Sequence, residues 1–344
     1  MRRYYIIDAL RAVLALCVVI GHTEVFPLFG PVGQADGLLD LLARAWRTIV
    51  FGPPAVIVFF VISGFCIHWP FAHGAQKVPL LRFYARRYLR IVIPLLAVVA
   101  IYKIVWPQAV VFGPSSILWH STLWSVVCEE IYYAAYPLLN RASRQAGWLP
   151  LVALALVAAA AIDLSYRSAQ DWEDLGIVYT TLVLSPVWLL GCHLAETISS
   201  TERTYSGRAI WLWRLGAWSV MWVAGVLHFH GGVYQTQTGV LVGIVAYFWV
   251  RAELCHEREG APWPPLVWAG GWSYSLYLVH PVVIGAFGLY ALRGPPRLIW
   301  VALFVSVLAA SYLFYLLIER PSHGLARKVS LFEAPKPQVQ TSPV

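Results

Sequence analysis

Long apolar runs follow one another along almost the whole chain, and short polar segments separate them. A helix needs about 20 apolar residues to cross the hydrocarbon core of a bilayer, and each run is close to that length. The pattern therefore predicts an all-α, polytopic membrane helix bundle with about ten transmembrane helices. We expect these helices at residues 6–26, 48–69, 88–106, 118–139, 148–165, 176–197, 209–229, 232–250, 267–290 and 297–318.

The composition agrees with this interpretation. Hydrophobic residues make up 59% of the 344 residues and charged residues only 12%, whereas soluble domains average about 45–50% apolar and 25% charged residues. With so few charged residues, the protein cannot form a polar surface around a core of this size. We therefore expect the excess apolar side chains to face lipid. The 17 Trp and 18 Tyr suit the membrane–water interface, where one end of the ring meets lipid and the other meets water.

The net charge of +8 would suggest a nucleic acid partner in a soluble protein, but here the basic residues indicate the orientation in the membrane. Cytoplasmic connections are enriched in Lys and Arg. If every predicted helix crosses, both termini are cytoplasmic, and no nucleic acid partner is expected. The basic segments on that side are residues 2–3, 77–90, 141–144, 203–208 and 320–328, with Arg44, Arg47, Arg293 and Arg297 as exceptions on the other side.

We expect one membrane-embedded domain, residues 1–325, followed by a disordered cytoplasmic tail, residues 326–344, which contains Pro and Gln. The first apolar run holds Asp8, Arg11 and His22, which the short core of a cleaved signal peptide would avoid. We therefore interpret it as a retained membrane span. The five cysteines form no Cys-x-x-Cys pair, so neither a metal site nor a disulfide framework is predicted.

Ionisable side chains within the predicted spans are the candidates for function, because charges at membrane depth are costly and usually face a cavity or a partner. In the first span, Arg11 follows Asp8 by three residues, so the two share a helix face and can form an ion pair. His22 lies eleven residues after Arg11, about 16 Å along the same face. These residues would line one path through the bundle. Alternatively, Asp8 and Arg11 form an interfacial ion pair and His22 only caps the helix.

The second candidate is a pair of neighbouring carboxylates in the fourth span. Glu129 and Glu130 lie about 100° apart around a helix, so they cannot share a face, and one of them is expected to point into the protein. A carboxyl group removed from water can exchange protons near neutral pH, which suits acid–base catalysis. Alternatively, both carboxylates cap or anchor the span by pairing with arginines.

The third candidate is an arginine cluster before the third span, formed by Arg86, Arg87 and Arg90. Arg87 and Arg90 are three residues apart and share a helix face. Guanidinium groups bind phosphates through two parallel hydrogen bonds. Alternatively, arginines at this position fix the topology or contact anionic lipid.

Two further patterns indicate structural roles. His68 lies near the end of a predicted span, and we interpret it as a loop or interface residue. Residues 59–65 include Ser63 and Gly64, and small residues at such positions let two helices pack closely.

Taken in order, several segments resemble a known family. They are Ile-Asp-Ala-Leu-Arg-Ala (7–12), Gly-His (21–22), Val-Phe-Phe-Val-Ile-Ser-Gly-Phe (58–65), Arg-Tyr-Leu-Arg-Ile-Val-Ile-Pro (87–94), Leu-Trp-Ser-Val-Val-Cys-Glu-Glu-Ile-Tyr-Tyr (123–133), Ser-Tyr-Ser-Leu-Tyr-Leu-Val-His-Pro (273–281) and Glu-Arg-Pro (319–321). In this order and spacing the chain resembles the acyltransferase-3 family of integral membrane O-acyltransferases. Members of that family modify surface polysaccharides, lipopolysaccharide, peptidoglycan and some small molecules.

The resemblance implies ten core helices and a multi-pass protein of the cell membrane, in a bacterium the inner membrane. It implies a cytoplasmic acyl-CoA, in the first place acetyl-CoA, as donor substrate, with no permanently bound cofactor and no metal. It also implies catalytic roles for Arg11, for His22 and for Glu129 or Glu130, and donor binding by the Arg-x-x-Arg motif, here Arg87 and Arg90. We expect Arg86 to bind the CoA phosphates beside them. The chain departs from the family pattern at Cys128 and Ile131, where Val and Gln are frequent, and neither change removes a candidate reactive group.

The expected reaction is the attack of an acceptor hydroxyl on the thioester carbonyl, with His22 as the base, either directly or through an acyl-histidine. The expected acceptor is a carbohydrate or glycolipid of the cell surface, with an antibiotic or another secondary metabolite as the alternative. Two other classes remain open. A transporter or flippase would use the same charges to line a substrate path and would not depend on CoA. A non-catalytic scaffold would have no need of these groups at membrane depth.

Overall fold

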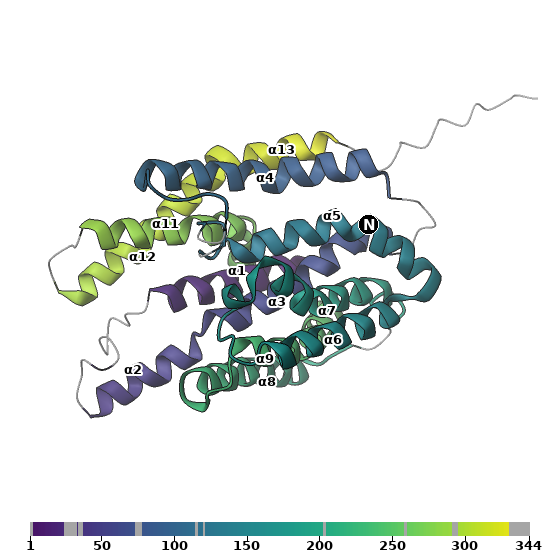
Figure 1. The fold of residues 1–344 in the computed structure, drawn as a ribbon, viewed down its shortest axis with the longest axis horizontal. Helices are drawn as coiled ribbons and strands as arrows, with labels where there is room; N and C mark the ends of the chain where they lie inside the picture. Colours follow the sequence, from purple (N-terminus) through teal and green to yellow (C-terminus); the bar gives the residue numbers. More distant parts are fainter. Residues whose placement is uncertain are drawn as a thin grey trace, which may run out of the picture.

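In the computed structural model, residues 3–23, 33, 37–72, 78–113, 116–119, 121–201, 204–257, 260–290 and 295–329 are described (Figure 1). Every regular element among them is helical, which confirms the all-α fold class. In chain order the elements are α1 (Tyr5–His22), α2 (Leu38–Ile49), α3 (Gly52–His68), η1 (Trp69–Phe71), α4 (Leu80–Val105), α5 (Trp124–Ala146), α6 (Trp148–Ser165), η2 (Trp172–Leu175), α7 (Gly176–Thr197), α8 (Gly207–Val226), η3 (Leu227–Gly231), α9 (Gln235–His256), α10 (Pro264–Gly270), α11 (Ser273–Tyr290), α12 (Pro296–Phe314), η4 (Tyr315–Glu319) and α13 (Arg320–Lys328).

Each of the ten predicted spans corresponds to a helix, and eight of the helical segments in the described residues are long and apolar enough to cross a membrane. These eight contain α1, α3, α4, α6, α7, α8, α9 and α12. The other two predicted spans correspond to α5 and α11. α5 carries Glu129, Glu130, Arg141 and Arg144, which lower its mean hydropathy, and α11 contributes only a shorter apolar stretch, Ser273–Gly288. The count of ten and the cytoplasmic position of both termini stay predictions.

Three predicted boundaries differ most from the structure. The third span was expected from residue 88, but α4 begins at Leu80, so the predicted arginine cluster lies within this helix and not before it. The fourth span was expected from residue 118, but α5 begins at Trp124, after a series of turns. The ninth span was expected as one helix over residues 267–290, but the helix is interrupted at Gly271 and Trp272, between α10 and α11. In contrast, the predicted spans 209–229 and 232–250 leave only a very short turn between them, and such a turn follows η3, where Gly232 adopts a positive φ of 63°, which residues with a side chain rarely adopt.

α2 is an element that the apolar runs did not predict. It is only 12 residues long, too short to cross a bilayer, and its apolar residues lie on one face. Leu38, Leu39 and Leu41 are exposed on this helix, whereas Ala43 and Thr48 are buried. An amphipathic helix of this kind suits the boundary between lipid and water.

α3 lies at the centre of the bundle and packs against α7, α1 and α9. The contact with α7 depends on two glycines. A Cβ atom at Gly64 would lie 2.0 Å from the carbonyl oxygen of Trp188, and one at Gly191 would lie 2.1 Å from that of Val61. Backbone therefore meets backbone at this crossing, which confirms the packing role predicted for Gly64.

A second group of helices surrounds α1. α10 and α11 pack against it, and at Gly270 a Cβ atom would lie 1.8 Å from the carbonyl oxygen of Asp8. α4 packs on the other side of α11 and runs beside α13, as Figure 1 shows. The ends of α1, α3, α4, α5 and α11 enclose the cavities described below.

The predicted domain boundary falls within α13, because residues 326–328 belong to this helix and Ala326 is buried. The rest of the predicted tail, residues 330–344, lies outside the described residues. Among the basic residues used for the orientation, Arg2, Lys77, Arg203 and Arg293 also lie outside them.

Candidate functional site

Two cavities lie within the helices around α1. We name the first the arginine cavity; its volume is about 560 Å³, and five arginines line it, Arg3, Arg11, Arg86, Arg87 and Arg90. We name the second the histidine cavity; its volume is about 930 Å³, and His22 lies in its wall. Both volumes fall in the range of small-molecule binding sites.

The two cavities lie end to end along the bundle. α1, α4 and α11 line the arginine cavity with their earlier residues and the histidine cavity with their later ones. α3 runs the opposite way and lines them in the reverse order. Val56 and Tyr277 line both cavities, so these two side chains belong to the partition between them. The expected single path past Arg11 and His22 is thus two compartments with a common wall.

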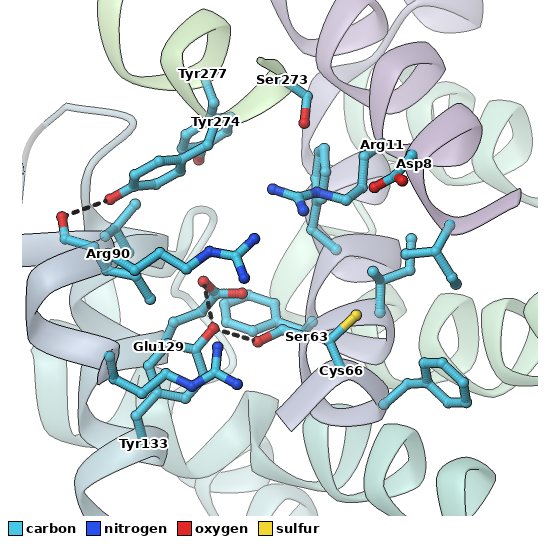
Figure 2. Close-up of a pocket in the computed structure, with 18 of the residues that line it drawn as sticks. Asp8, Arg11, Ser63, Cys66, Arg90, Glu129, Tyr133, Ser273, Tyr274 and Tyr277 are labelled. Atoms are coloured by element: carbon cyan, nitrogen blue, oxygen red, sulfur yellow. Dashed lines mark hydrogen bonds between the residues drawn. The ribbon is translucent and has the colours of Figure 1, made fainter. Parts of the chain in front are cut away.

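The arginine cavity collects all four arginines that the sequence singled out. Arg11 comes from α1 and the other three from α4, and Figure 2 shows Arg11 and Arg90 extending toward each other across the cavity. Within the described residues, Arg11, Arg87 and Arg90 form no ion pair. The guanidinium group of Arg87 instead lies 5.6 Å from the ring centre of Tyr133. Five arginines face three carboxylates in this lining, so the cavity is positively charged and suits an anionic ligand.

The predicted ion pair between Asp8 and Arg11 is wrong. The carboxylate of Asp8 accepts a hydrogen bond from Arg3 at 2.8 Å instead. Arg3 precedes the helix and can fold back over its first turn, whereas the side chain of Arg11 turns into the cavity. The neutralisation of Asp8 by Arg3 leaves the charge of Arg11 available to a ligand.

Glu129 also lines the arginine cavity, and a chain of hydrogen bonds positions it. Trp188 Nε1 donates to Ser63 Oγ at 3.3 Å, Ser63 and Tyr133 share a bond of 2.7 Å, and Tyr133 donates to Glu129 Oε2 at 3.2 Å. Figure 2 shows the last two bonds. Ser63 and Gly64 therefore have different functions. Gly64 allows the close crossing with α7, and Ser63 helps to orient Glu129 through Tyr133.

Glu130 does not line either cavity. Its Oε1 atom is buried and has no hydrogen-bond partner among the described residues. The prediction that the two carboxylates point in different directions is therefore confirmed. Of the pair, Glu129 is the one that faces the arginines.

Glu319 is a residue of this cavity that our choice of candidates missed. It is 1% exposed, and its Oε2 atom accepts hydrogen bonds from the backbone N–H of Ser275, at 3.0 Å, and from the hydroxyl of Ser275. His323 lies 3.5 Å from its other oxygen. The Glu-Arg-Pro segment, already noted in the sequence, was the signal that could have identified it.

His22 lies at the end of α1 and is exposed to the histidine cavity. Its Nδ1 atom lies 2.8 Å from the carbonyl oxygen of Val18 and 3.3 Å from Nε2 of His280, on α11. His280 is fully buried, and its Nδ1 atom lies 3.1 Å from the carbonyl oxygen of Leu276. We had not chosen His280 as a candidate, although the segment over residues 273–281 contains it.

Aromatic and acidic side chains form much of the remaining wall of the histidine cavity. The aromatic residues are Phe51, Tyr102, Trp106, Trp124, Trp172, Phe229 and Tyr277, and the acidic residues are Asp171, Glu173 and Asp174. Gln235 donates a hydrogen bond to Asp171, which ties α9 to this loop. The cavity thus presents flat apolar faces beside hydrogen-bond acceptors.

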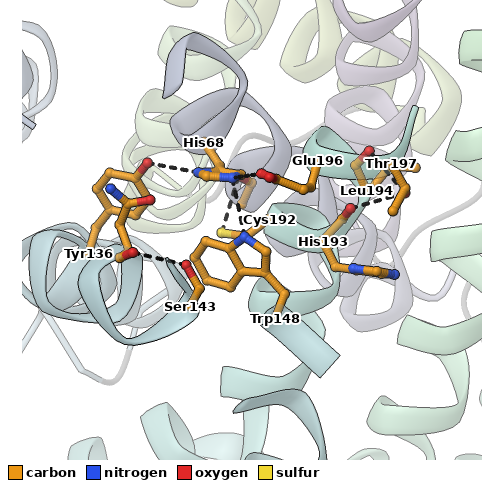
Figure 3. Close-up of polar contacts among 11 residues, drawn as sticks. His68, Tyr136, Ser143, Trp148, Cys192, His193, Leu194, Glu196 and Thr197 are labelled. Carbon is orange, nitrogen blue, oxygen red and sulfur yellow. Dashed lines mark hydrogen bonds and ion pairs between the residues drawn. The ribbon is translucent and has the colours of Figure 1, made fainter. Parts of the chain in front are cut away.

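His68 is not the loop or interface residue that we expected. It is 2% exposed and belongs to a buried network between α3, α5, α6 and α7, shown in Figure 3. Its Nδ1 lies 2.9 Å from the hydroxyl of Tyr136, and its Nε2 lies 2.6 Å from Glu196 and 3.2 Å from Trp148 Nε1. The described part of the chain contains no group of three or more His, Cys, Asp or Glu residues that could hold a metal ion.

Comparison with known proteins identifies the family of this chain. The model of the acyltransferase domain of the acyltransferase-3 family matches residues 4–316, nearly the whole chain. The chain belongs to the acyltransferase-3 family. With its apolar helices, this member is a multi-pass membrane acyltransferase. No curated protein and no solved structure matches the chain.

Proposed function

We propose that this acyltransferase-3 member moves an acyl group, in the first place acetyl, from cytoplasmic acyl-CoA to a hydroxyl of a cell-surface carbohydrate or glycolipid. The donor binds in the arginine cavity and the acceptor in the histidine cavity. The observation that carries the proposal is the arrangement of the two cavities, one cationic and one holding a histidine, with Val56 and Tyr277 in their common wall.

Acyl-CoA suits the arginine cavity because of its phosphates. Arg11, Arg87 and Arg90 present guanidinium groups that no carboxylate neutralises within the described residues, and each can bind two phosphate oxygens at once. Glu129 and Glu319 also line this cavity without forming an ion pair with these three arginines in the described part of the chain, and they lower its net positive charge.

The thioester must reach His22 from the donor side. His22 lies about 16 Å from Arg11 along the helix axis, and the partition at Val56 and Tyr277 lies between them. The hydroxyl of Tyr277 is tied to Ser125 Oγ and to the carbonyl oxygen of Thr122, both at 2.7 Å, so its ring has a fixed position. If the narrow acyl-bearing part of acyl-CoA passes beside this ring, the thioester carbonyl carbon enters the histidine cavity.

The chemistry follows from the protonation of His22. A carbonyl oxygen can only accept, so the contact with Val18 places a proton on Nδ1 and the lone pair on Nε2. Nε2 takes the proton of the acceptor hydroxyl as its oxygen attacks the thioester carbonyl. The C–O bond forms, the C–S bond breaks, and the proton passes to the CoA thiolate. An acyl group carried first by Nε2 gives the same products in two steps.

The wall of the histidine cavity suits a carbohydrate acceptor. Aromatic faces such as that of Trp106, which is partly exposed, can pack against the apolar faces of sugar rings, and carboxylates accept hydrogen bonds from hydroxyl groups. An acceptor held there has its hydroxyl group in the compartment of His22 and away from the donor's phosphates.

The test is acetyl-CoA binding to the purified protein in detergent, measured by calorimetry. Arg87→Ala/Arg90→Ala should lose saturable binding. The matched control is Arg141→Ala/Arg208→Ala, which removes the same charge from exposed positions that line neither cavity and should bind like wild type. A folded wild-type protein that binds no acyl-CoA would overturn the donor assignment and favour a transporter.

The partition gives a second test. Val56→Trp adds a large side chain between the cavities, so it should keep acetyl-CoA binding and lose acyl transfer, measured with labelled acetyl-CoA and membranes that contain the acceptor. Transfer at the wild-type rate in this variant would contradict the proposed route.

A further inference from the structure

His280 contacts His22 and has no part in the mechanism above. We propose that His280 is a positioning residue that fixes the proton of His22 on Nδ1 and stabilises the charge that His22 gains in the reaction. The proposal rests on the acyltransferase function and on the contact between His280 Nε2 and His22 Nδ1.

The protonation of His280 follows from its own surroundings. Its Nδ1 lies 3.1 Å from the carbonyl oxygen of Leu276, one helical turn earlier, so Nδ1 carries the hydrogen and Nε2 carries the lone pair. The residue is 0% exposed, and burial disfavours a second proton because the charged ring would lose its hydration. His280 therefore presents a hydrogen-bond acceptor toward α1.

This acceptor meets the N–H group of His22. The Nδ1–H of His22 points to the carbonyl oxygen of Val18 at 2.8 Å and to Nε2 of His280 at 3.3 Å, so two acceptors share it. The tautomer with the hydrogen on Nε2 would leave both acceptors facing a lone pair. Because of this pairing, the basic nitrogen of His22 is Nε2.

The same contact gains strength during the reaction. When Nε2 of His22 takes the hydroxyl proton, the ring becomes an imidazolium ion, and its Nδ1–H becomes a charged donor to His280. Hydrogen bonds to charged groups are roughly twice as strong as neutral ones. His280 thus acts on the ring nitrogen where an aspartate acts in a serine-hydrolase triad, but without a negative charge.

The fold supplies this contact from two distant segments. The two histidines are 258 positions apart in the sequence, and α1 packs directly against α11. Pro281 follows His280 and has no N–H to donate to the carbonyl group of Tyr277. The helix therefore lacks one backbone hydrogen bond next to His280 and Tyr277.

The test compares His280→Phe, which fills the space but accepts no hydrogen bond, with His280→Gln, whose amide oxygen can accept one. Transfer from labelled acetyl-CoA is measured with saturating acceptor membranes, and each variant is first checked for a single peak in size-exclusion chromatography. We expect kcat to fall about 10- to 100-fold in His280→Phe, with an unchanged acetyl-CoA KM, and to recover at least in part in His280→Gln. A merely structural role would lower the folded yield of both variants and leave kcat per folded molecule unchanged.

A double variant separates this proposal from the proposed function. If His280 acts through His22, then His22→Ala/His280→Phe is no slower than His22→Ala, since the partner is already gone. Wild-type kcat in folded His280→Phe, or a further loss in the double variant, would overturn the role of His280 alone. Absence of acetyl-CoA turnover by the wild-type protein would overturn the proposed function instead. If His280→Phe does not fold, His280→Leu replaces it, with the same expected outcomes.

Discussion

Two histidines end neighbouring helices of this bundle, and their surroundings differ in one decisive respect. His68, at the end of α3, is enclosed by Tyr136, Trp148 and Glu196, which contact both of its ring nitrogens (Figure 3). His22, at the end of α1, has contacts from Val18 and His280 at Nδ1 and opens onto a cavity of about 930 Å³. The first arrangement links four helices, and the second leaves the proposed base exposed to a cavity.

The comparison shows that burial and hydrogen bonding alone do not indicate function. Both histidines lie at the end of an apolar helix, and both contact further polar or aromatic groups. His68 also borders a cavity, of about 450 Å³, so the difference is the exposure of the ring: His68 is 2% exposed, whereas His22 is exposed to its cavity. Both ring nitrogens of His68 contact protein groups and the ring is buried, whereas the ring of His22 has its Nδ1 atom held by Val18 and His280 and is exposed to a cavity.

The largest expected effect is on His22. Replacement by Ala removes the proposed base, so transfer per folded molecule should fall by roughly 10²–10⁴-fold, with acetyl-CoA binding unchanged because the arginine cavity is intact. The measurement is transfer from labelled acetyl-CoA, beside calorimetry of the same preparation. His230→Ala is the matched control, since His230 is exposed and lines neither cavity. Retained transfer in His22→Ala would remove His22 from the mechanism.

A smaller effect, of a different kind, is expected at His68. The change His68→Ala leaves the buried polar groups of Tyr136 and Trp148 without this partner, and each such loss costs roughly 1–3 kcal/mol of the free energy of unfolding. The midpoint of thermal unfolding in detergent should therefore fall. Transfer per folded molecule should stay at the wild-type level below that temperature. A tenfold loss of transfer in folded protein would break the comparison and place His68 among the functional residues.

The smallest effect is expected at Glu196. Its side chain is 46% exposed, so water screens its charge. Glu196→Gln removes the charge but keeps an amide group beside His68 Nε2, which can either accept or donate, and the free energy of unfolding should change by less than about 1 kcal/mol. Thermal unfolding of this variant beside His68→Ala tests whether the hydrogen bonds or the charge stabilise the network. A loss as large as that of His68→Ala would show that the charge dominates.

Much of this protein was predictable from local pattern. Apolar runs near 20 residues indicated helices that the structure contains, because a helix must present apolar side chains to lipid along its whole length. The spacing of Arg87 and Arg90 placed them on one face of α4, and the angle between Glu129 and Glu130 sent them in different directions. Each of these inferences needs only the geometry of a single helix.

Contacts between helices were beyond such reasoning. Asp8 was assigned to Arg11 by spacing, but Arg3 reached it from outside the regular helix. Likewise, no periodicity relates His280 to His22, since their contact depends on how α1 packs against α11. The network around His68 has the same origin, because four helices contribute to it.

The sequence by itself determined the helical class, the membrane location, the family and most of the charged side chains of the site, because these depend on composition, spacing and ordered motifs. Only the tertiary structure decided that the site has two compartments, that Val56 and Tyr277 lie between them, and that His280 accompanies His22. The physical reason is that a cavity is the volume left between packed helices. Its shape depends on crossings such as that of Gly64 with Gly191, where a single methyl group would force the backbones apart.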